Sequence, residues 1–375
     1  MTRKRNRKRK LSIKKISIFI TLIILTTVFL LNISNIKNIY LSKITGYNKD
    51  TIEVFLETDT YNQIKNHEYS KTLETILNTD YYNKKYIKEY LDIKYLENDN
   101  FLKNTNTLLD KGYTSIDINN IYDKLSQESI NILLDNNYIK DITNIISISY
   151  FHEDNLERYI KYYEKEELDV ETILTYVNIG LDNSYYTNVK NIENQNDILV
   201  LVNKYNKLSN DYVPSDLETI NAKYQWYGRS NQLRKDARIA FEEMCEAAIR
   251  DNIYIYAGSG YRSYKTQLYL YNNYVSRDGF AAAETYSARA SYSEHQTGLA
   301  MDIANKTDFI SEGDKEYDWL INNSYKYGFI LRYPKNKEKI TGFMYEEWHY
   351  RYVGKETAKE VYESNLTYDE FMAKK

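Results

Sequence analysis

The order of apolar and polar positions divides the chain into three parts. Residues 16–33 read ISIFITLIILTTVFLLNI, eighteen residues without a charge. From there to about residue 197, short segments with helical apolar spacing alternate with Asn and Asp, with no Pro and very little Gly. This pattern predicts helices. After Ile198 glycine becomes frequent and Pro214 is the first proline, so a new domain is predicted to begin at about residue 198.

The middle part contains a loose internal repeat. The segment Leu108-Leu109-Asp110-Lys111-Gly112-Tyr113 recurs as Leu133-Leu134-Asp135-Asn136-Asn137-Tyr138, and a third, poorer copy lies near residues 166–169. Short helical units that stack and bury their apolar faces against one another would produce this spacing. We interpret residues 36–197 as an all-α, repeat-like spacer, with a surface that binds a protein partner as the alternative.

Residues 198–375 mix helices and strands without a regular β-α-β alternation, which predicts an α+β domain with an antiparallel sheet and flanking helices. The expected helices cover residues 234–250, a segment ending near 274, 317–327 with Gly328 as its stop, and 356–364. The expected strands cover residues 253–256, 329–333 and 342–353, with a Gly-Ser-Gly turn at 258–260.

Charge is distributed unevenly along the chain. Residues 1–15 hold nine Lys or Arg and no acid, and they precede the apolar run directly. Such a run approaches the length that spans a bilayer, and the positive-inside rule predicts a cytoplasmic tail (1–15), a transmembrane anchor (16–35) and an extracellular remainder. A cleaved signal peptide is the competing interpretation, but no small-x-small cleavage site follows the run.

The remainder of the chain is acidic and has one cysteine. Taking the nine N-terminal bases from the total of 50 leaves 41 against 53 acids, a net charge of about −12, which disfavours a nucleic-acid partner. Cys245 is the only cysteine, so no intrachain disulfide can form. Its amphipathic helical surroundings predict a buried thiol.

Two short segments supply the side chains of a hydrolytic zinc site. His295 and Asp302 lie in SEHQTGLAMD, and Glu346 and His349 lie in EEWH about fifty residues later. A catalytic zinc keeps three protein ligands and one position for water, whose pKa falls to roughly 7. We predict His295, Asp302 and His349 as the ligands and Glu346 as the general base. Two imidazoles and a carboxylate also suit other transition metals.

The spacing of these residues constrains the backbone. On a helix, His295 and Asp302 would be about 10.5 Å apart along the axis, and in one straight strand their side chains would lie on opposite faces. The chain must therefore bend between them, most simply at Thr297-Gly298. Glu346 and His349 lie in an aromatic, β-branched segment, which indicates a bulge or the entry to a strand.

These segments resemble the VanY-type D-alanyl-D-alanine carboxypeptidases, zinc peptidases that trim the stem peptide of bacterial peptidoglycan. The resemblance covers about residues 198–375. The family pattern Ser-x-His-x-x-Gly-x-Ala-x-Asp matches Ser293, His295, Gly298, Ala300 and Asp302, and Glu-x-x-His matches Glu346 and His349. A family segment Ser-Gly-Tyr-Arg-Ser occurs as residues 259–263, with Gln267 following. The resemblance implies the fold that hedgehog signalling domains share with D-Ala-D-Ala peptidases.

The resemblance also implies roles for the upstream segment. Arg262 would hold negative charge, either on the developing oxyanion or on the terminal carboxylate of the substrate, since guanidinium pairs with carboxylate in a fixed fork. Tyr261, Gln267 and Ser293 would line the same pocket. The sequence departs from the family at two places: Ala290-Ser291 replaces the usual Pro-Gly, and Glu347 replaces a proline.

The leading functional hypothesis is a membrane-anchored, zinc-dependent D,D-carboxypeptidase that hydrolyses the terminal D-Ala-D-Ala bond of peptidoglycan stem peptides. An L,D-carboxypeptidase acting on tetrapeptide stems is the first alternative. The second is a non-catalytic module that binds the cell wall and retains a vestigial metal site. Glu346 argues against this module, because a purely structural zinc needs no base.

Overall fold

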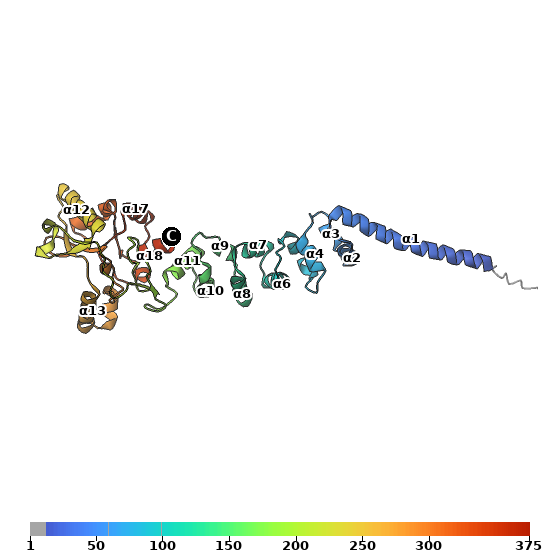
Figure 1. Cartoon of the computed structure of the whole chain (residues 1–375), viewed down its shortest axis with the longest axis horizontal. Helices are drawn as coiled ribbons and strands as arrows, with labels where there is room; N and C mark the ends of the chain where they lie inside the picture. The colour runs from blue at the N-terminus through green and yellow to red at the C-terminus, as the bar shows by residue number, and fades with distance from the viewer. Residues whose placement is uncertain (1–12, 59, 99) are drawn as a thin grey trace, which may run out of the picture. The chain divides into compact units, whose positions relative to one another are not determined.

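The computed structural model describes residues 13–58, 60–98 and 100–375 (Figure 1). Most of the predicted basic tail, residues 1–12, therefore lies outside the described residues. The chain groups into two compact units, Met1–Ile146 and Ser147–Lys375. The second unit includes residues 147–197 together with the predicted peptidase region, and the domain boundary at residue 198 stays a prediction.

The first helix of the described chain, α1 (Ile13–Thr45), contains the apolar run. It is long and apolar enough to cross a membrane. The large apolar side chains between Ile16 and Ile33 are exposed, Phe19 and Leu30 among them. Near its other end Leu41 is buried, so that part of the helix packs against the folded segment that follows.

The rest of the first unit consists of short helices: α2 (Lys49–Glu57), α3 (Tyr61–Ile64), α4 (Lys71–Leu77), η1 (Lys84–Tyr86), α5 (Ile87–Asp92), α6 (Phe101–Lys111), α7 (Ser115–Lys124), α8 (Gln127–Asp135) and α9 (Ile142–Ile145). The prediction of a mostly helical region is confirmed. The side chains of Ser70, Thr114 and Ser126 cap α4, α7 and α8, which explains where these helices begin.

Polar contacts in this unit join segments about one repeat apart. Lys111 Nζ donates to Asn136 O at 2.6 Å, and the backbone N–H of Ile139 donates to the Tyr113 hydroxyl at 3.2 Å. These contacts connect the two sequence copies described above. They show that the second copy packs directly on the first, as stacked helical units would.

The second unit contains helices and short strands, and its elements up to the sheet are η2 (Glu153–Asn155), α10 (Leu156–Lys165), α11 (Val170–Ile179), β1 (Lys190–Asn191), β2 (Asn206–Lys207), β3 (Leu217–Thr219), η3 (Ala222–Tyr224), η4 (Trp226–Gly228), β4 (Gln232–Arg234) and α12 (Lys235–Arg250). The remaining elements are β5 (Tyr256–Ser259), α13 (Tyr264–Asp278), α14 (Phe280–Tyr286), η5 (Glu294–Thr297), β6 (Ala300–Ala304), α15 (Lys315–Asn323), η6 (Ser324–Tyr327), β7 (Phe329–Leu331), α16 (Glu338–Thr341), β8 (His349–Tyr352), α17 (Lys355–Ser364) and α18 (Tyr368–Ala373).

The main sheet has the order β5-β6-β8-β7, and every pair in it is antiparallel. This confirms the predicted antiparallel α+β architecture. Met301, Ile303 and Tyr350 belong to the core that also includes Phe241 and Met244 of α12. Because side chains alternate along a strand, Asp302 and its neighbours on β8 face the opposite side of the sheet from this core. Cys245 of α12 is buried, as predicted.

Several predicted boundaries are wrong. The strand expected at 253–256 is β5 (Tyr256–Ser259), so two residues of the expected turn lie in the strand. Glycine is required there by close packing, since a Cβ at Gly258 would lie 2.8 Å from the backbone oxygen of Asp302. The strand expected at 342–353 is only β8 (His349–Tyr352), because Gly342 has φ +77° and ends α16.

Candidate active site

The pairing of β6 with β8 brings two of the predicted ligands together. Asp302 lies opposite His349 in the register of the two strands. The N–H of Ile303 donates to Trp348 O at 2.9 Å, so the next pair along, Asp302 and His349, is the type without ladder hydrogen bonds. In such pairs the side chains approach most closely. The sheet itself therefore juxtaposes these two residues, and His349 opens β8 as the predicted strand entry.

The third predicted ligand, His295, comes from η5, directly before β6. Gly298 ends this turn with φ +67°, in the left-handed region that favours glycine. A Cβ there would also lie 2.8 Å from Leu217 Cδ2. The predicted bend at Thr297-Gly298 is confirmed, and it folds His295 back over Asp302. His295 Nδ1 is 2.7 Å from Gly260 O, which leaves Nε2 to face the aspartate.

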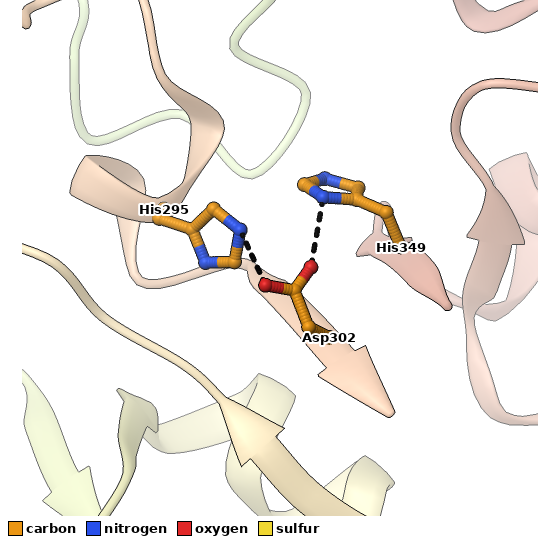
Figure 2. A group of neighbouring side chains, drawn as sticks. All are labelled: His295, Asp302 and His349. Carbon is orange, nitrogen blue, oxygen red and sulfur yellow. Dashed lines mark ion pairs between the residues drawn. The ribbon is translucent and has the colours of Figure 1, made fainter. Parts of the chain in front are cut away.

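Figure 2 shows Asp302 between the two imidazoles, with one carboxylate oxygen toward each ring. His295 Nε2 is 3.3 Å from Asp302 Oδ2, and His349 Nδ1 is 3.1 Å from Asp302 Oδ1. A tetrahedral metal with bonds of about 2.0–2.1 Å separates its ligand atoms by about 3.3 Å. One potential ligand atom from each residue lies within 4.8 Å of the others, and all three residues are buried. The three side chains fit one divalent cation.

The electrostatics of the cluster agree with this fit. His295 Nε2 and Asp302 Oδ1 are buried, and among the described residues their polar partners are the ion pairs within this cluster. Burial, together with the nearby Arg262 guanidinium, lowers the pKa of His295 to about 4. Burial opposes ionisation of Asp302, but the imidazoles of His295 and His349 hold its pKa well below the usual range. A neutral imidazole and an ionised carboxylate are the forms that bind metals.

His349 is surrounded by carboxylates. Burial acts against its protonation, but Asp302 and Glu294 raise the pKa of His349 to about 9. The carboxylates around His349 favour a positive charge near them. Either a proton on His349 or a cation between the two rings would supply it. A bound cation would replace that proton.

Glu346 lies beside the cluster, in the turn that leads into β8. Its Oε2 is 3.5 Å from His349 Nδ1, and its backbone oxygen accepts from the His349 N–H at 3.2 Å. Burial raises the pKa of Glu346 to about 7, with His349 opposing the shift and Asp302 adding to it. A carboxyl group with a pKa near neutrality suits a general base.

A cavity of about 690 Å³ opens onto these residues. It is lined by Arg229, Ser259, Arg262, Gln267, Leu270, Tyr274, Arg277, Tyr286, Ser287, Ala288, Ser293, Glu294, His295, Asp302, Phe309, Tyr333, Phe343, Met344, Glu346, Trp348 and His349. Seven of the eight predicted site residues are in this set; Tyr261 is the exception. Tyr261 therefore does not line the cavity as predicted. Its neighbour Arg262 does, as is usual for adjacent residues of an extended segment.

Arg262 is held in place by a glutamine. Its Nη1 donates to Gln267 Oε1 at 2.9 Å, and Gln267 Nε2 donates to Ala288 O at 2.7 Å. Arg262 Nη2 is 3.5 Å from Asp302 Oδ2. Arg262 Nε is buried and makes no hydrogen bond to any described residue. The guanidinium is thus fixed at the edge of the cavity, and its contacts with Gln267 and Asp302 use only two of its five N–H groups.

The two departures from the family pattern have different structural outcomes. Ser291 adopts φ +72°, the conformation that a glycine would favour, and its hydroxyl is 2.7 Å from Asn210 Oδ1. The turn is therefore kept despite the substitution. Glu347 is half-buried and is not among the residues that line the cavity.

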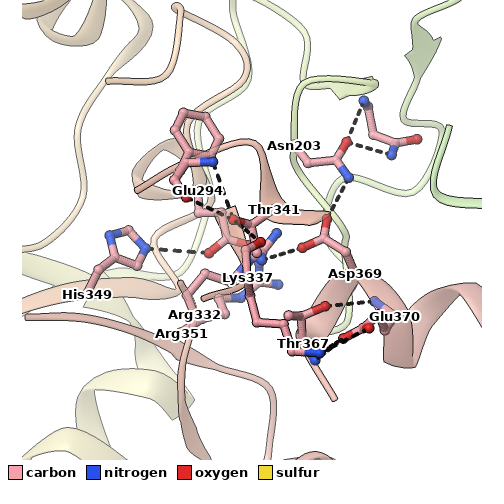
Figure 3. A network of polar contacts seen from close by, with 12 residues as sticks. Asn203, Glu294, Arg332, Lys337, Thr341, His349, Arg351, Thr367, Asp369 and Glu370 are labelled. Carbon is pink, nitrogen blue, oxygen red and sulfur yellow. Dashed lines mark hydrogen bonds and ion pairs between the residues drawn. The ribbon is translucent and has the colours of Figure 1, made fainter. Parts of the chain in front are cut away.

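The sequence prediction missed a buried charge network behind His349 (Figure 3). Glu294 Oε1 accepts from Arg332 Nε and Arg351 Nη1, each at 2.8 Å. Arg332 Nη1 also donates to Asp369 Oδ2 at 2.6 Å. A signal was available, because Arg332 in FILRY and Arg351 in HYRYV are single charges inside aromatic, strand-like segments.

The fold and the cavity together define a peptidase domain. The family profile described as VanY, D-alanyl-D-alanine carboxypeptidase, matches residues 230–355. The chain is 40% identical over 210 residues to YodJ of Bacillus subtilis strain 168, named as a carboxypeptidase, covering 52% of this chain and 76% of that protein. It is 39% identical over 185 residues to a D-alanyl-D-alanine carboxypeptidase of Enterococcus faecalis, covering 46% of this chain and 65% of that protein.

Among solved structures, the LdcB LD-carboxypeptidase is 40% identical, with a TM-score of 0.48, covering 51% of this chain and 92% of the other. The chain belongs to the VanY family of D-alanyl-D-alanine carboxypeptidases.

Proposed function

We propose that this chain is a membrane-anchored, zinc-dependent D,D-carboxypeptidase that removes the terminal D-alanine from peptidoglycan stem peptides. The observation that carries the proposal is the convergence of His295, Asp302 and His349 with Glu346 and Arg262 on one cavity. The similarity to the D-alanyl-D-alanine carboxypeptidase of Enterococcus faecalis supports the choice of substrate.

His295, Asp302 and His349 would hold the zinc through two ring nitrogens and a carboxylate oxygen. When bound, zinc supplies positive charge that polarises the scissile carbonyl and lowers the pKa of water. Two neutral imidazoles and one carboxylate leave a net charge near +1 at the centre, which is compatible with this role.

Glu346 handles the proton in this mechanism. Its carboxylate accepts a proton from the attacking water as the new C–O bond forms at the carbonyl carbon. It then gives that proton to the departing nitrogen as the C–N bond breaks, so D-alanine leaves as a free amino acid. The pKa of about 7, raised by burial, places Glu346 where both transfers are accessible near neutral pH.

Arg262 orients the substrate through its terminal carboxylate. A carboxypeptidase must recognise a free carboxylate, and Arg262 is the fixed guanidinium beside the metal cluster. The N–H groups of Nη1 and Nη2 that Gln267 and Asp302 leave unused can donate to a substrate oxygen while Gln267 keeps its hydrogen bond. Ser293 also lines this cavity, two residues before His295, and would contact the peptide there.

The N-terminal helix α1 would be the anchor. Its length and apolar composition support this assignment, with the following domains outside the cell and residues 1–15 in the cytoplasm. A cleaved signal sequence would give the same composition. The mass of the chain recovered from membranes distinguishes the two, because only an uncleaved chain retains residues 1–35.

The test of the activity uses the full chain in detergent with defined stem peptides. Products from a pentapeptide ending in D-Ala-D-Ala and from the matching tetrapeptide are weighed by mass spectrometry. We expect loss of one alanine from the pentapeptide, abolished by a chelator and restored by zinc. Cleavage of the tetrapeptide with an intact pentapeptide would instead support the L,D-carboxypeptidase. Binding without cleavage of either would support the non-catalytic module.

A further inference from the structure

Four buried charged side chains form the centre of the polar network in Figure 3, next to the predicted ligand His349. Glu294, Arg332, Arg351 and Asp369 are each at most 1% exposed. Two of them are cations and two are anions, so the group is neutral as a whole. Charges this deeply buried are tolerated only when they are paired and hydrogen-bonded.

Within this group the two carboxylate oxygens of Glu294 face different partners. Oε1 accepts from both arginines at 2.8 Å. Oε2 is buried, makes no hydrogen bond to a described residue, and lies 3.6 Å from His349 Nε2. His349 Nδ1 faces Asp302, so the imidazole has a predicted ligand partner on one side and a fixed carboxylate on the other. Such outer carboxylates fix the orientation of metal-binding histidines.

Asp369, on the C-terminal helix α18, anchors the end of the Arg332 guanidinium that does not contact Glu294. Its Oδ2 accepts from Arg332 Nη1 at 2.6 Å, while Arg332 Nε serves Glu294. Its Oδ1 accepts from Asn203 Nδ2 at 2.8 Å. Arg332 Nη2, the group beside Nε, is buried and makes no hydrogen bond to a described residue. Without the Asp369 carboxylate, Nη1 loses its acceptor, so the guanidinium can turn against Glu294 and shift Oε2 relative to His349. One positive charge would then remain unbalanced beside the cation site.

We propose that Asp369 is a positioning residue of the metal centre, which sets the orientation of His349 through Arg332 and Glu294. The inference rests on the metal site of the proposed function. Because Asp369 lies on α18, this helix would then be part of the structure that supports the metal site. The same helix contacts α11, where Asn178 Nδ2 donates to Ala373 O at 3.1 Å, so α18 is held from both sides.

The test compares zinc affinity in Asp369→Asn and Thr367→Ala. Thr367 caps the same helix through Glu370, and within the described part of the chain it makes no hydrogen bond to Arg332. Both variants of the full chain are titrated with zinc in detergent against a chromophoric chelator, at a temperature where circular dichroism shows them folded. We expect zinc binding to weaken about tenfold or more in Asp369→Asn, and to stay at the wild-type value in Thr367→Ala.

A second measurement reads the imidazole directly. The chain has four histidines, so ring nitrogen signals in long-range ¹H–¹⁵N spectra can be assigned by substitution. We expect the His349 ring signals to change in zinc-free Asp369→Asn and to remain unchanged in Thr367→Ala. If Asp369→Asn does not fold, Asn203→Ala, which removes the donor to Asp369 Oδ1, is titrated instead and should weaken zinc binding in the same direction.

The outcomes separate this inference from the function beneath it. A wild-type chain that binds no zinc overturns the proposed function. A wild type that binds zinc, with equal affinity in Asp369→Asn and Thr367→Ala, overturns the role of Asp369 alone. If Asn203→Ala is measured in place of Asp369→Asn, a zinc affinity equal to that of the wild type likewise overturns the role of Asp369.

Discussion

Replacement of Arg262 by lysine tests how the cavity recognises its substrate. Gln267 accepts a hydrogen bond from one N–H of Arg262 Nη1, and further N–H groups of the guanidinium remain for a carboxylate in the cavity. A lysine ammonium has three donors on a single nitrogen and lacks the planar fork. It therefore cannot bond Gln267 and present a second, fixed donor to a carboxylate at a different position.

The expected loss follows from one charged hydrogen bond. Hydrogen bonds to charged groups are worth about 1.5–3 kcal/mol, and 1.36 kcal/mol corresponds to a factor of ten. Arg262→Lys should thus lower kcat/KM by about 10- to 150-fold for a peptide with a free terminal carboxylate. For the same peptide ending in an amide, where the wild type has already lost this contact, the fall should be much smaller.

The assay measures kcat/KM on the acid and amide forms of one peptide, for the wild type and the variant. Arg277→Lys is the control, because Arg277 lines the same cavity but is exposed and paired with Asp278. An exposed ion pair is worth at most about 1 kcal/mol, so the control should lose less than about fivefold. Equal losses on acid and amide would refute carboxylate recognition and indicate that Arg262 stabilises the developing oxyanion.

Three further predictions concern the base, a ligand and a buried lysine. Glu346→Gln should keep one zinc per chain and lower kcat by about 10²–10⁴-fold, measured on the pentapeptide; full activity would show that the base is another group. His295→Ala should lose zinc in metal analysis of the purified chain, and a variant that retained stoichiometric zinc would contradict the ligand set. Burial lowers the pKa of Lys204, which is 2% exposed, to about 8, with Glu284 opposing the shift. The unfolded chain therefore binds more protons between that value and the usual pKa near 10.5, so the wild type should gain roughly 2 kcal/mol of stability relative to Lys204→Met from pH 8 to 9.5. Urea unfolding of both proteins across this pH range measures the difference in their unfolding free energies. A difference that does not change with pH would disprove the prediction.

Features with a local cause could be predicted from the sequence. The helix at Lys235–Arg250 follows from its apolar spacing, and Gly328 ends η6 in a left-handed conformation as expected. The bend at Gly298 follows from geometry alone, since neither a helix nor a strand can bring His295 to Asp302. The likeness of spaced motifs to a family then led to the remaining site residues.

Features that depend on distant partners could not be predicted. The segment before His349 is as aromatic as a strand, yet only residues opposite β6 and β7 find ladder partners, so β8 is short. Helix α18 is six residues long, and distant segments hold it in place, through the ion pair of Asp369 with Arg332 among other contacts. The local sequence YDEFMA contains no pattern from which that contact could be predicted. The family motif assigned Tyr261 to the cavity, but of that segment Ser259 and Arg262 are the residues that line it.

The cross-strand pairing of Asp302 with His349 has a consequence for how this domain can vary. A slip of one residue between β6 and β8 would turn one of the two side chains into the core, so the register cannot drift without destroying the centre. The segment that joins the two strands also carries β7, Arg332 and Glu346, but its exposed residues 306–308 and 311–313 have no such constraint. Insertions and deletions there would reshape the rim while the pair stays in place, which gives a single hydrolytic centre room to serve differently shaped peptides.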